Sequence, residues 1–221
     1  MKKVLLVATV QSHIAQFHRS LAEILHANGC EVHVAAKNNL AEKNGLTIDF
    51  ADKIFDVPLS RSPKNKDNII AYRQLKSIID AEHYDVIHCN TPMGGIVTRL
   101  AARKARRKGT KVFYTAHGFH FYEGSPKWNW IVYYPIEKYF SHYTDTLITI
   151  TQEDYKLASE KFHCKVEHIH GVGVNEGRYF TITKHEKSVQ REKMGFKKEQ
   201  KIILCIGELN DCLLYTSDAA D

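Results

Sequence analysis

A cluster of polar groups follows one apolar run in the middle of the chain. Residues 112–116 are apolar and end at His117 and Gly118, with a second histidine, a tyrosine and Glu123 close behind. Ligands of open α/β sheets bind just beyond the carboxyl ends of the strands, where an imidazole can hydrogen-bond a substrate or carry a proton. Gly118 permits a turn that would aim the ring into a crevice. A strand-end histidine that bonds only to a neighbouring backbone group explains this segment equally well.

Two other predicted strands also end in polar residues. Residues 2–8 lead into Ser12 and His13, and residues 85–89 lead into Asn90 and Thr91. Strand ends at Asn90 and His117 deliver polar groups to the same edge of a parallel sheet, which favours a ligand site over coincidence. Ser12 is either a ligand contact or simply the cap of the helix that follows.

The turn after the first strand suits an anion, because helix amino termini carry unpaired N–H groups and a partial positive charge. No glycine lies between Met1 and Asn28, so the turn lacks the G-x-G-x-x-G spacing of a dinucleotide site. This counts against a nicotinamide or flavin enzyme. Arg61, between two serines in a loop, suits phosphate recognition, although exposed loop arginines are common.

A basic segment free of acidic residues follows Asn90 and Thr91. Between Thr98 and Lys111, four arginines recur at helical spacing and would share one side of a helix: Arg99, Arg103, Arg106 and Arg107. Such a stripe could contact anionic lipid headgroups, nucleic acid, or only water.

The composition is typical of a globular α/β protein. The chain has 221 residues, a net charge of +6 and 43% hydrophobic residues, and no apolar run approaches the roughly 18 residues of a membrane span. We therefore expect a cytoplasmic protein. The five cysteines form no Cys-x-x-Cys pair, and the histidine pairs have no third ligand nearby, so we expect reduced thiols and no metal site.

Hydrophobic periodicity predicts strands alternating with helices, and hence an α/β fold with a Rossmann-like, doubly wound parallel sheet. The predicted strands are residues 2–8, 31–36, 85–89, 112–116, 146–150 and 165–170, and the predicted helices are residues 13–28, 128–140 and 152–161, with one more capped by Asp67.

The predicted domain spans residues 1–180. The charged residues 181–200 are expected to be a linker or a surface helix, and the apolar run that begins at residue 201 resembles the first strand of a second α/β domain, to about residue 210. Residues 211–221 have neither strand nor helix period, and we expect them to be non-native.

An aromatic-rich helix is predicted over residues 128–140, with Pro135 kinking it or starting a new segment. Its side chains could be core, shape an acceptor channel or lie at a membrane interface.

Several stretches together resemble the amino-terminal half of bacterial family 4 glycosyltransferases, especially the exopolysaccharide and capsule subgroup. They are VATVQSHIAQFH, GCEVHVAA, SRSP, YDVIHCNTPMGGIVTRLAARKARRKGTKV, YTAHGFHFYEG, YYPIEKYF, TDTLITITQEDY, GVGVNEGRYF and ILCIGELN. The resemblance implies a two-lobed GT-B fold with this chain as the acceptor-side lobe and the second lobe almost entirely missing. It implies transfer with retention from a nucleotide-sugar, a UDP-sugar, without a metal or other cofactor.

The resemblance also implies roles for individual residues. His117 would be the catalytic histidine that faces the reacting sugar, and Ser12, His13 and Gly118 would lie against the donor phosphates. Asn90, Thr91, Arg61 and Glu123 would lie on the acceptor side, although the subgroup often has histidine in place of Asn90. The acceptor would be a lipid-linked saccharide at the inner face of the plasma membrane, with Arg99, Arg103, Arg106 and Arg107 as membrane contacts and no nucleic acid as partner.

In the family, the Glu-x7-Glu motif that binds the donor belongs to the carboxyl-terminal lobe, of which these 221 residues would hold only the first strand, so we expect the chain alone to be inactive. A sugar-nucleotide epimerase of the same architecture and a non-catalytic module that binds anionic lipid or nucleic acid are the alternatives.

Overall fold

The computed structural model describes residues 1–43, 45–171, 173, 181–197 and 199–204. The chain divides into two compact units, residues 1–173 and 174–221, and each is described by itself.

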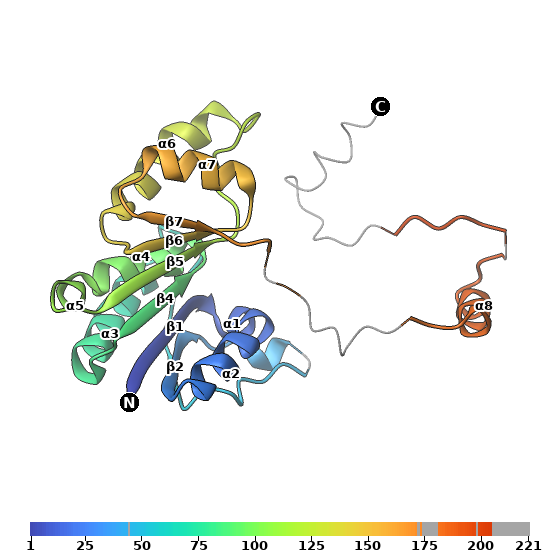
Figure 1. The fold of residues 1–221 in the computed structure, drawn as a ribbon, viewed down its shortest axis with the longest axis horizontal. Coiled ribbons are helices and arrows are strands. Elements are labelled where there is room, and N and C mark those ends of the chain that lie inside the picture. Colours follow the sequence, from blue (N-terminus) through green and yellow to red (C-terminus); the bar gives the residue numbers. More distant parts are fainter. Residues whose placement is uncertain (44, 172, 174–180, 198, 205–221) are drawn as a thin grey trace. The chain divides into compact units, whose positions relative to one another are not determined.

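The first unit is built on a seven-stranded sheet with the order β3-β2-β1-β4-β5-β6-β7, and every neighbouring pair is parallel (Figure 1). The strands are β1 (Lys2–Val10), β2 (Cys30–Lys37), β3 (Lys53–Asp56), β4 (Val86–Asn90), β5 (Lys111–Ala116), β6 (Thr146–Thr149) and β7 (Lys165–His168). The chain runs outward from β1 in one direction to β3 and, after crossing back, in the other direction to β7. The predicted doubly wound parallel sheet is thereby confirmed.

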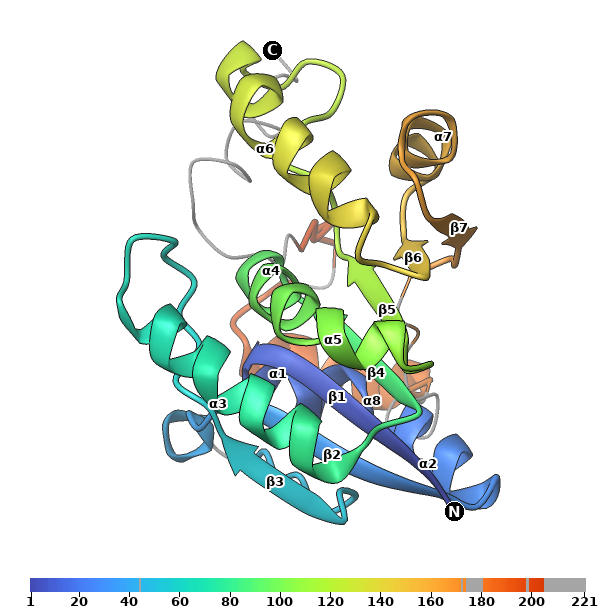
Figure 2. The same cartoon turned by 90° about the vertical axis from the view of Figure 1, so that its left-hand side faces the viewer.

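Helices cover both faces of this sheet. They are α1 (Gln11–Phe17), α2 (Arg19–Ala27), α3 (Asp67–Glu82), α4 (Pro92–Ala101), α5 (Arg103–Arg107), α6 (Lys127–Ser141) and α7 (Gln152–Lys161), with a 3-10 turn, η1 (Leu40–Glu42). Figure 2 views the face on which α3, α4 and α5 lie.

The side chains of β1 alternate between two hydrophobic cores, one on each face of the sheet. Leu5 and Val7 pack in the core that α3 and α4 cover. Leu6 and Ala8 pack in the other core, with Ile14 of α1. Helices α1 and α4 therefore leave β1 and β4 on opposite faces, and in open α/β sheets ligands bind where two such neighbouring strands end.

Several helix boundaries differ from those predicted. Residues 13–28 form two helices, α1 and α2, interrupted at His18. Ser12 and Asp67, the predicted amino-terminal caps, are not at the cap positions. Val10 precedes α1 and Lys66 precedes α3, and neither makes a side-chain capping bond. Pro135 lies inside the single helix α6 and does not start a new segment.

The second unit contains the helix α8 (Lys184–Lys193), where a linker or surface helix was predicted. Thr183 and Glu186 form a reciprocal capping box at its start, and no α8 residue is buried. Residues 201–204 form no strand, which differs from the prediction. The rest of that predicted strand, the predicted non-native tail and residues 174–180 at the predicted domain end lie outside the described residues.

Across the part of the chain that the structure describes, no helix combines the length and apolar character needed to cross a membrane.

Candidate functional site

The carboxyl ends of β1, β4 and β5 bring together residues that are far apart in the sequence, and this region is called the candidate crevice. His13 follows β1, Asn90 ends β4 and His117 follows β5. The ring centroids of His13 and His117 lie 4.8 Å apart. In open α/β sheets, ligands bind at this change in strand order. The predicted convergence of the strand ends is therefore present.

The Asn90 side chain fixes how His117 presents its ring. Asn90 Nδ2 donates to the carbonyl oxygen of Val7 at 3.4 Å, so the amide oxygen faces the other way. That oxygen lies 3.4 Å from His117 Nε2 and can only accept, so Nε2 carries the proton. The second nitrogen of a neutral His117, Nδ1, is then an acceptor for a ligand hydroxyl.

Two further histidines extend the cluster behind His13 and His117. The His18 ring lies 5.6 Å from that of His13 and 5.8 Å from that of His88. His18 is 4% exposed, and the Nε2 atom of His88 bonds the Thr115 hydroxyl at 2.8 Å. The sequence predicted a ligand role for neither, because only the fold brings His18, which lies between α1 and α2, close to β4 and β5.

Burial keeps these imidazoles neutral. Desolvation lowers the pKa of His13 to about 3, with smaller contributions from His117, His18 and the charge of Arg61. Desolvation also lowers the pKa of His18 to about 4 and that of His88 to about 3, and it lowers the pKa of His117. At neutral pH the cluster therefore offers neutral hydrogen-bonding groups, and Arg61 supplies a permanent positive charge nearby.

Thr91 holds a strained backbone conformation at the same place. Its φ is 64° and its ψ is 147°, a region that glycine favours and that costs other residues about 1–3 kcal/mol. The Thr91 hydroxyl compensates by accepting from the Thr9 N–H at 3.1 Å and sharing a hydrogen bond with the Thr9 hydroxyl at 2.7 Å. A Cβ at Gly94 would lie 2.7 Å from this Thr91 oxygen, so only glycine fits there. Thr9 and Gly94 are site residues that sequence reasoning missed.

The other predicted ligand residues have varied surroundings. Ser12 is in the first turn of α1, where Asn39 donates to its hydroxyl at 2.9 Å and accepts from its N–H at 3.0 Å. Gly118 has a φ of 113°, which supports the predicted need for glycine there. Arg61 and Glu123 are exposed.

An exposed aromatic ring borders the histidines. Phe17 is 43% exposed, and its ring lies 4.9 Å from that of His13 and 6.2 Å from that of His117. Phe17 falls in the helix predicted over residues 13–28, and the sequence predicted no role for it in the site. Among the described residues, no group of three or more His, Cys, Asp or Glu side chains is placed to hold a metal ion.

The predicted membrane contact of Arg99 is wrong. Arg99 is 2% exposed, and its guanidinium bonds Glu137 of α6 at 3.0 Å and the Gly95 carbonyl at 3.0 Å. It also lies over the Tyr114 ring, 4.1 Å from the centroid. Helical spacing predicted a shared face for the four arginines, but that face points partly into the protein.

The basic segment also breaks into α4 and α5 at Ala102, so its arginines have different surroundings. Arg106 pairs with Asp145 at 2.9 Å and donates to the His142 carbonyl at 2.9 Å. Arg103 and Arg107 are exposed, as membrane contacts would have to be.

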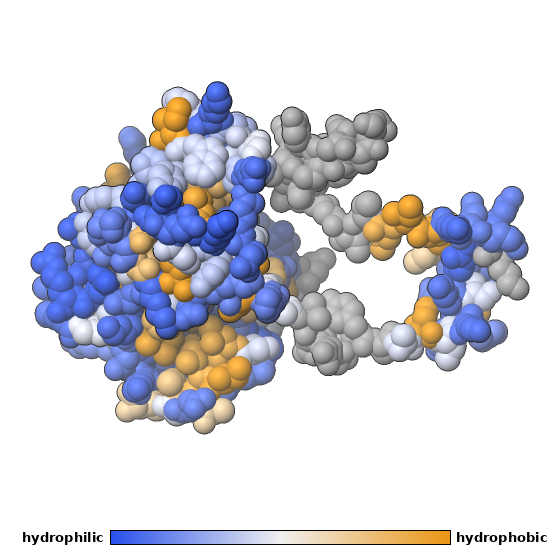
Figure 3. All heavy atoms as spheres, turned by 45° about the horizontal axis from the view of Figure 1, so that its top comes forward, coloured by the Kyte–Doolittle hydropathy of each residue, from blue (hydrophilic) through white to orange (hydrophobic). Residues whose placement is uncertain are grey.

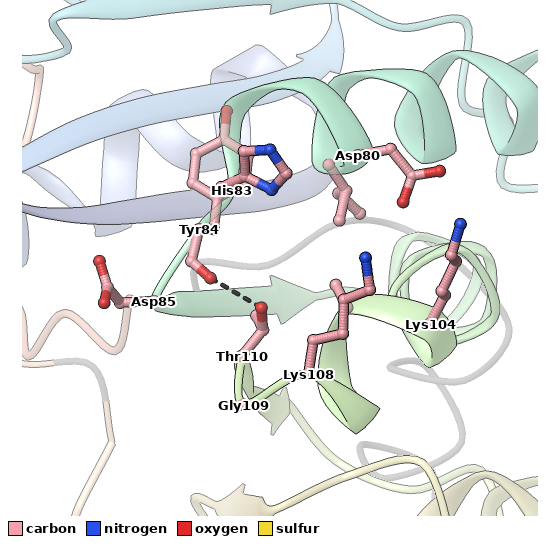
Figure 4. Close-up of a pocket in the computed structure, with 10 residues that line it drawn as sticks. Asp80, His83, Tyr84, Asp85, Lys104, Lys108, Gly109 and Thr110 are labelled. Carbon is pink, nitrogen blue, oxygen red and sulfur yellow. Dashed lines mark hydrogen bonds between the residues drawn. The ribbon is translucent and has the colours of Figure 1, made fainter.

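A separate hollow of about 430 Å³ lies at the opposite edge of the sheet, where β4 and β5 begin. Figure 4 shows Lys104 and Lys108 on one side of it and Asp80 and His83 on the other, and Asp85 also lines it. Its charges are mixed, and none of the predicted site residues line it.

The sequence matches the model of Glycosyltransferase Family 4 over residues 14–172. EpsD of Bacillus subtilis (strain 168), named as a glycosyltransferase, is 47% identical over 212 residues, covering 95% of this chain and 54% of the relative. The Escherichia coli UDP-Gal:alpha-D-GlcNAc-diphosphoundecaprenol alpha-1,3-galactosyltransferase is 27% identical over 200 residues, covering 83% of this chain and 49% of the relative. The chain thus spans about half the length of these relatives.

Solved structures share the fold at low sequence identity. UDP-GlcNAc 2-epimerase from Neisseria meningitidis bound to UDP-GlcNAc superimposes with a TM-score of 0.58 at 15% identity, over 90% of this chain and 55% of the other. HepE from Anabaena in complex with UDP and glucose superimposes with a TM-score of 0.56 at 16% identity, over 88% of this chain and 50% of the other. The likeness to the epimerase is therefore one of fold, whereas the Bacillus subtilis and Escherichia coli relatives by sequence are named as transferases. From its sequence and its fold together, the chain belongs to glycosyltransferase family 4.

Proposed function

We propose that this chain is the acceptor-side half of a retaining glycosyltransferase that moves a sugar from a UDP-sugar to a lipid-linked saccharide in exopolysaccharide or capsule biosynthesis, at the inner face of the plasma membrane. The observation that carries the proposal is His117, held by Asn90 in the crevice with one nitrogen left to accept from a sugar hydroxyl. The name of the Escherichia coli relative, which contains UDP-Gal and diphosphoundecaprenol, supports the two substrate classes.

In this proposal each part of the crevice has one task. His117 hydrogen-bonds the reacting sugar and orients it, and it is not the general base, because the leaving phosphate takes the acceptor proton. Ser12, His13 and Gly118 lie along the donor phosphates. Asn90, Thr91, Arg61 and Glu123 face the acceptor, where the fixed charge of Arg61 suits a diphosphate. Neither a metal nor another cofactor takes part.

The chain by itself is expected to be inactive. Transfer requires the donor to be positioned and water to be excluded, and in the two-lobed fold this needs a second lobe that closes over the sugar. Sugar transfer by the 221-residue chain alone would contradict this part of the proposal.

The test joins residues 1–210 to the carboxyl-terminal half of Bacillus subtilis EpsD and supplies labelled UDP-sugars with a diphosphoundecaprenol-linked sugar. We expect transfer to the lipid, and we expect His117→Ala to lower kcat by about 10²-fold or more if it orients the reacting sugar. His120→Ala is the matched control, because His120 is exposed on the same loop and should change kcat little. An epimerised UDP-sugar with no labelled lipid would overturn the proposal in favour of an epimerase.

A further inference from the structure

Helix α6 has two faces of different character. Its inward face carries Trp130, Tyr134 and Phe140, which pack against the rest of the first unit. On the other face, Trp128, Ile131 and Tyr139 are 68%, 63% and 52% exposed. At 3.6 residues per turn, these three and the exposed Pro135 align in one stripe along the helix. The outer stripe, Trp128, Ile131, Pro135 and Tyr139, therefore remains largely exposed to water in the part of the first unit that the structure describes.

The exposed charges of α6 itself are positive. Glu137 is the only acidic residue in α6, and it is buried against Arg99, so the outer stripe has no carboxylate of its own helix beside it. Lys127 is exposed next to Trp128. At the other end, the Arg103 guanidinium lies 4.6 Å from the centre of the Tyr143 ring.

Tyr143 links that cation to the outer stripe, because its hydroxyl shares a hydrogen bond of 3.0 Å with the hydroxyl of Tyr139. The exposed Arg107 of α5 adds a further positive charge on the same segment as Arg103. Exposed apolar and aromatic groups are thus flanked by cations at both ends of α6.

Apolar residues reach the surface elsewhere as well, as the orange areas in Figure 3 show, and Ile69 and Ile70 of α3 are 57% and 50% exposed. Scattered exposed apolar residues are ordinary in soluble proteins. The outer stripe differs because tryptophan and tyrosine are combined with flanking cations. This combination suits the boundary between the headgroups and acyl chains of an anionic bilayer.

We propose that the outer stripe of α6 docks on an anionic lipid bilayer. This deepens the proposed function, which requires a lipid-linked acceptor, and it replaces Arg99 and Arg106 as the centre of membrane contact. The loop from His117 leads directly into α6, and two hydrogen bonds tie this loop to the helix: Asn129 Nδ2 donates to the His120 carbonyl at 2.8 Å, and Trp130 Nε1 donates to the Tyr122 carbonyl at 3.3 Å. Docking of α6 would therefore hold the catalytic crevice close to the lipid surface.

The test is co-sedimentation of the 221-residue chain with vesicles of phosphatidylcholine alone or mixed with phosphatidylglycerol. We expect binding to the mixed vesicles that weakens as salt is raised. The double variant Trp128→Ser, Ile131→Ser should lower the partition coefficient at least about tenfold, because two large apolar side chains no longer enter the bilayer. The matched control, Ile69→Ser with Ile70→Ser on α3, also removes two exposed apolar side chains and should bind like the unchanged chain.

Fluorescence provides a second, independent measurement. The chain has two tryptophans, so Trp130→Phe leaves Trp128 as the only one, and its emission should shift to the blue and be quenched by brominated lipid when mixed vesicles are added. Absence of vesicle binding, equal loss in the α3 control, or no change in Trp128 emission would overturn the proposal. So would a stable dimer that the Trp128→Ser, Ile131→Ser variant abolishes, since the outer stripe would then be an interface between copies. Vesicle binding needs no catalysis, so its failure can be distinguished from failure of the transferase proposal.

Discussion

Replacing Arg99 tests whether this arginine of the basic segment is buried in an ion pair with Glu137, as in the structure. In Arg99→Ala, the Glu137 carboxylate loses the cation that bonds it at 3.0 Å, while the carboxylate itself stays buried. The variant also loses the bond to the Gly95 carbonyl and the contact with the Tyr114 ring. Removing one partner of a buried ion pair typically costs about 3–5 kcal/mol, and we expect a loss in this range from the free energy of unfolding.

Urea denaturation at neutral pH measures this loss for the folded first unit. The matched control is Arg107→Ala, an exposed arginine of the same segment, which should change the free energy of unfolding by less than about 0.5 kcal/mol. The double variant Arg99→Met, Glu137→Leu should recover much of the loss, because no uncompensated charge stays buried. If Arg99→Ala costs less than about 1 kcal/mol, the arginine is solvated and the internal ion pair described above is refuted.

Three further predictions concern the packing and the protonation of the site. Gly95→Ala should lower the free energy of unfolding by about 1–3 kcal/mol, measured by urea denaturation, because a Cβ there would lie 2.6 Å from the Tyr114 ring; an unchanged midpoint would contradict this contact. The folded-state pKa of His18 is lowered to about 4, whereas the unfolded pKa is about 6.5, so the unfolded chain binds a proton at His18 more readily. The contribution of neutral His18 to the free energy of unfolding is therefore complete above about pH 6.5 and is lost as the pH falls toward 4. Between pH 7 and pH 5 this contribution falls by about 2 kcal/mol, and His18→Asn should remove that part of the pH dependence. Nitrogen NMR should find His117 protonated on Nε2, and Asn90→Leu should yield a mixture of tautomers because the accepting oxygen is gone; an unchanged tautomer would show that Asn90 does not fix the ring.

The chain order and the periodicity of apolar residues predicted most of the sheet, because parallel strands buried on both faces read as apolar runs. The ends of those runs also predicted that Asn90 and His117 share an edge. Thr91 shows where such reasoning stops: its strained φ of 64° depends on the Thr9 hydroxyl, 82 positions away in the sequence. His18 was missed for a similar reason, since its neighbour His88 is on a strand that only the fold brings close.

The wrong prediction of Arg99 as a membrane contact and the two different faces of helix α6 have one physical cause. Helical spacing indicates which residues share a face, but the partner across the interface decides whether that face is buried. Glu137 lies 38 positions beyond Arg99, and the hydrogen bond between them keeps the Arg99 guanidinium buried. The same bond places the face of α6 that carries Glu137 against the rest of the first unit. Trp128 and Ile131 are then necessarily turned outward, because they lie on the other side of the same helix. Core packing and a membrane interface, which the sequence left as alternatives for this helix, are therefore compatible: the ion pair that removes Arg99 from the surface also directs the outer stripe toward it.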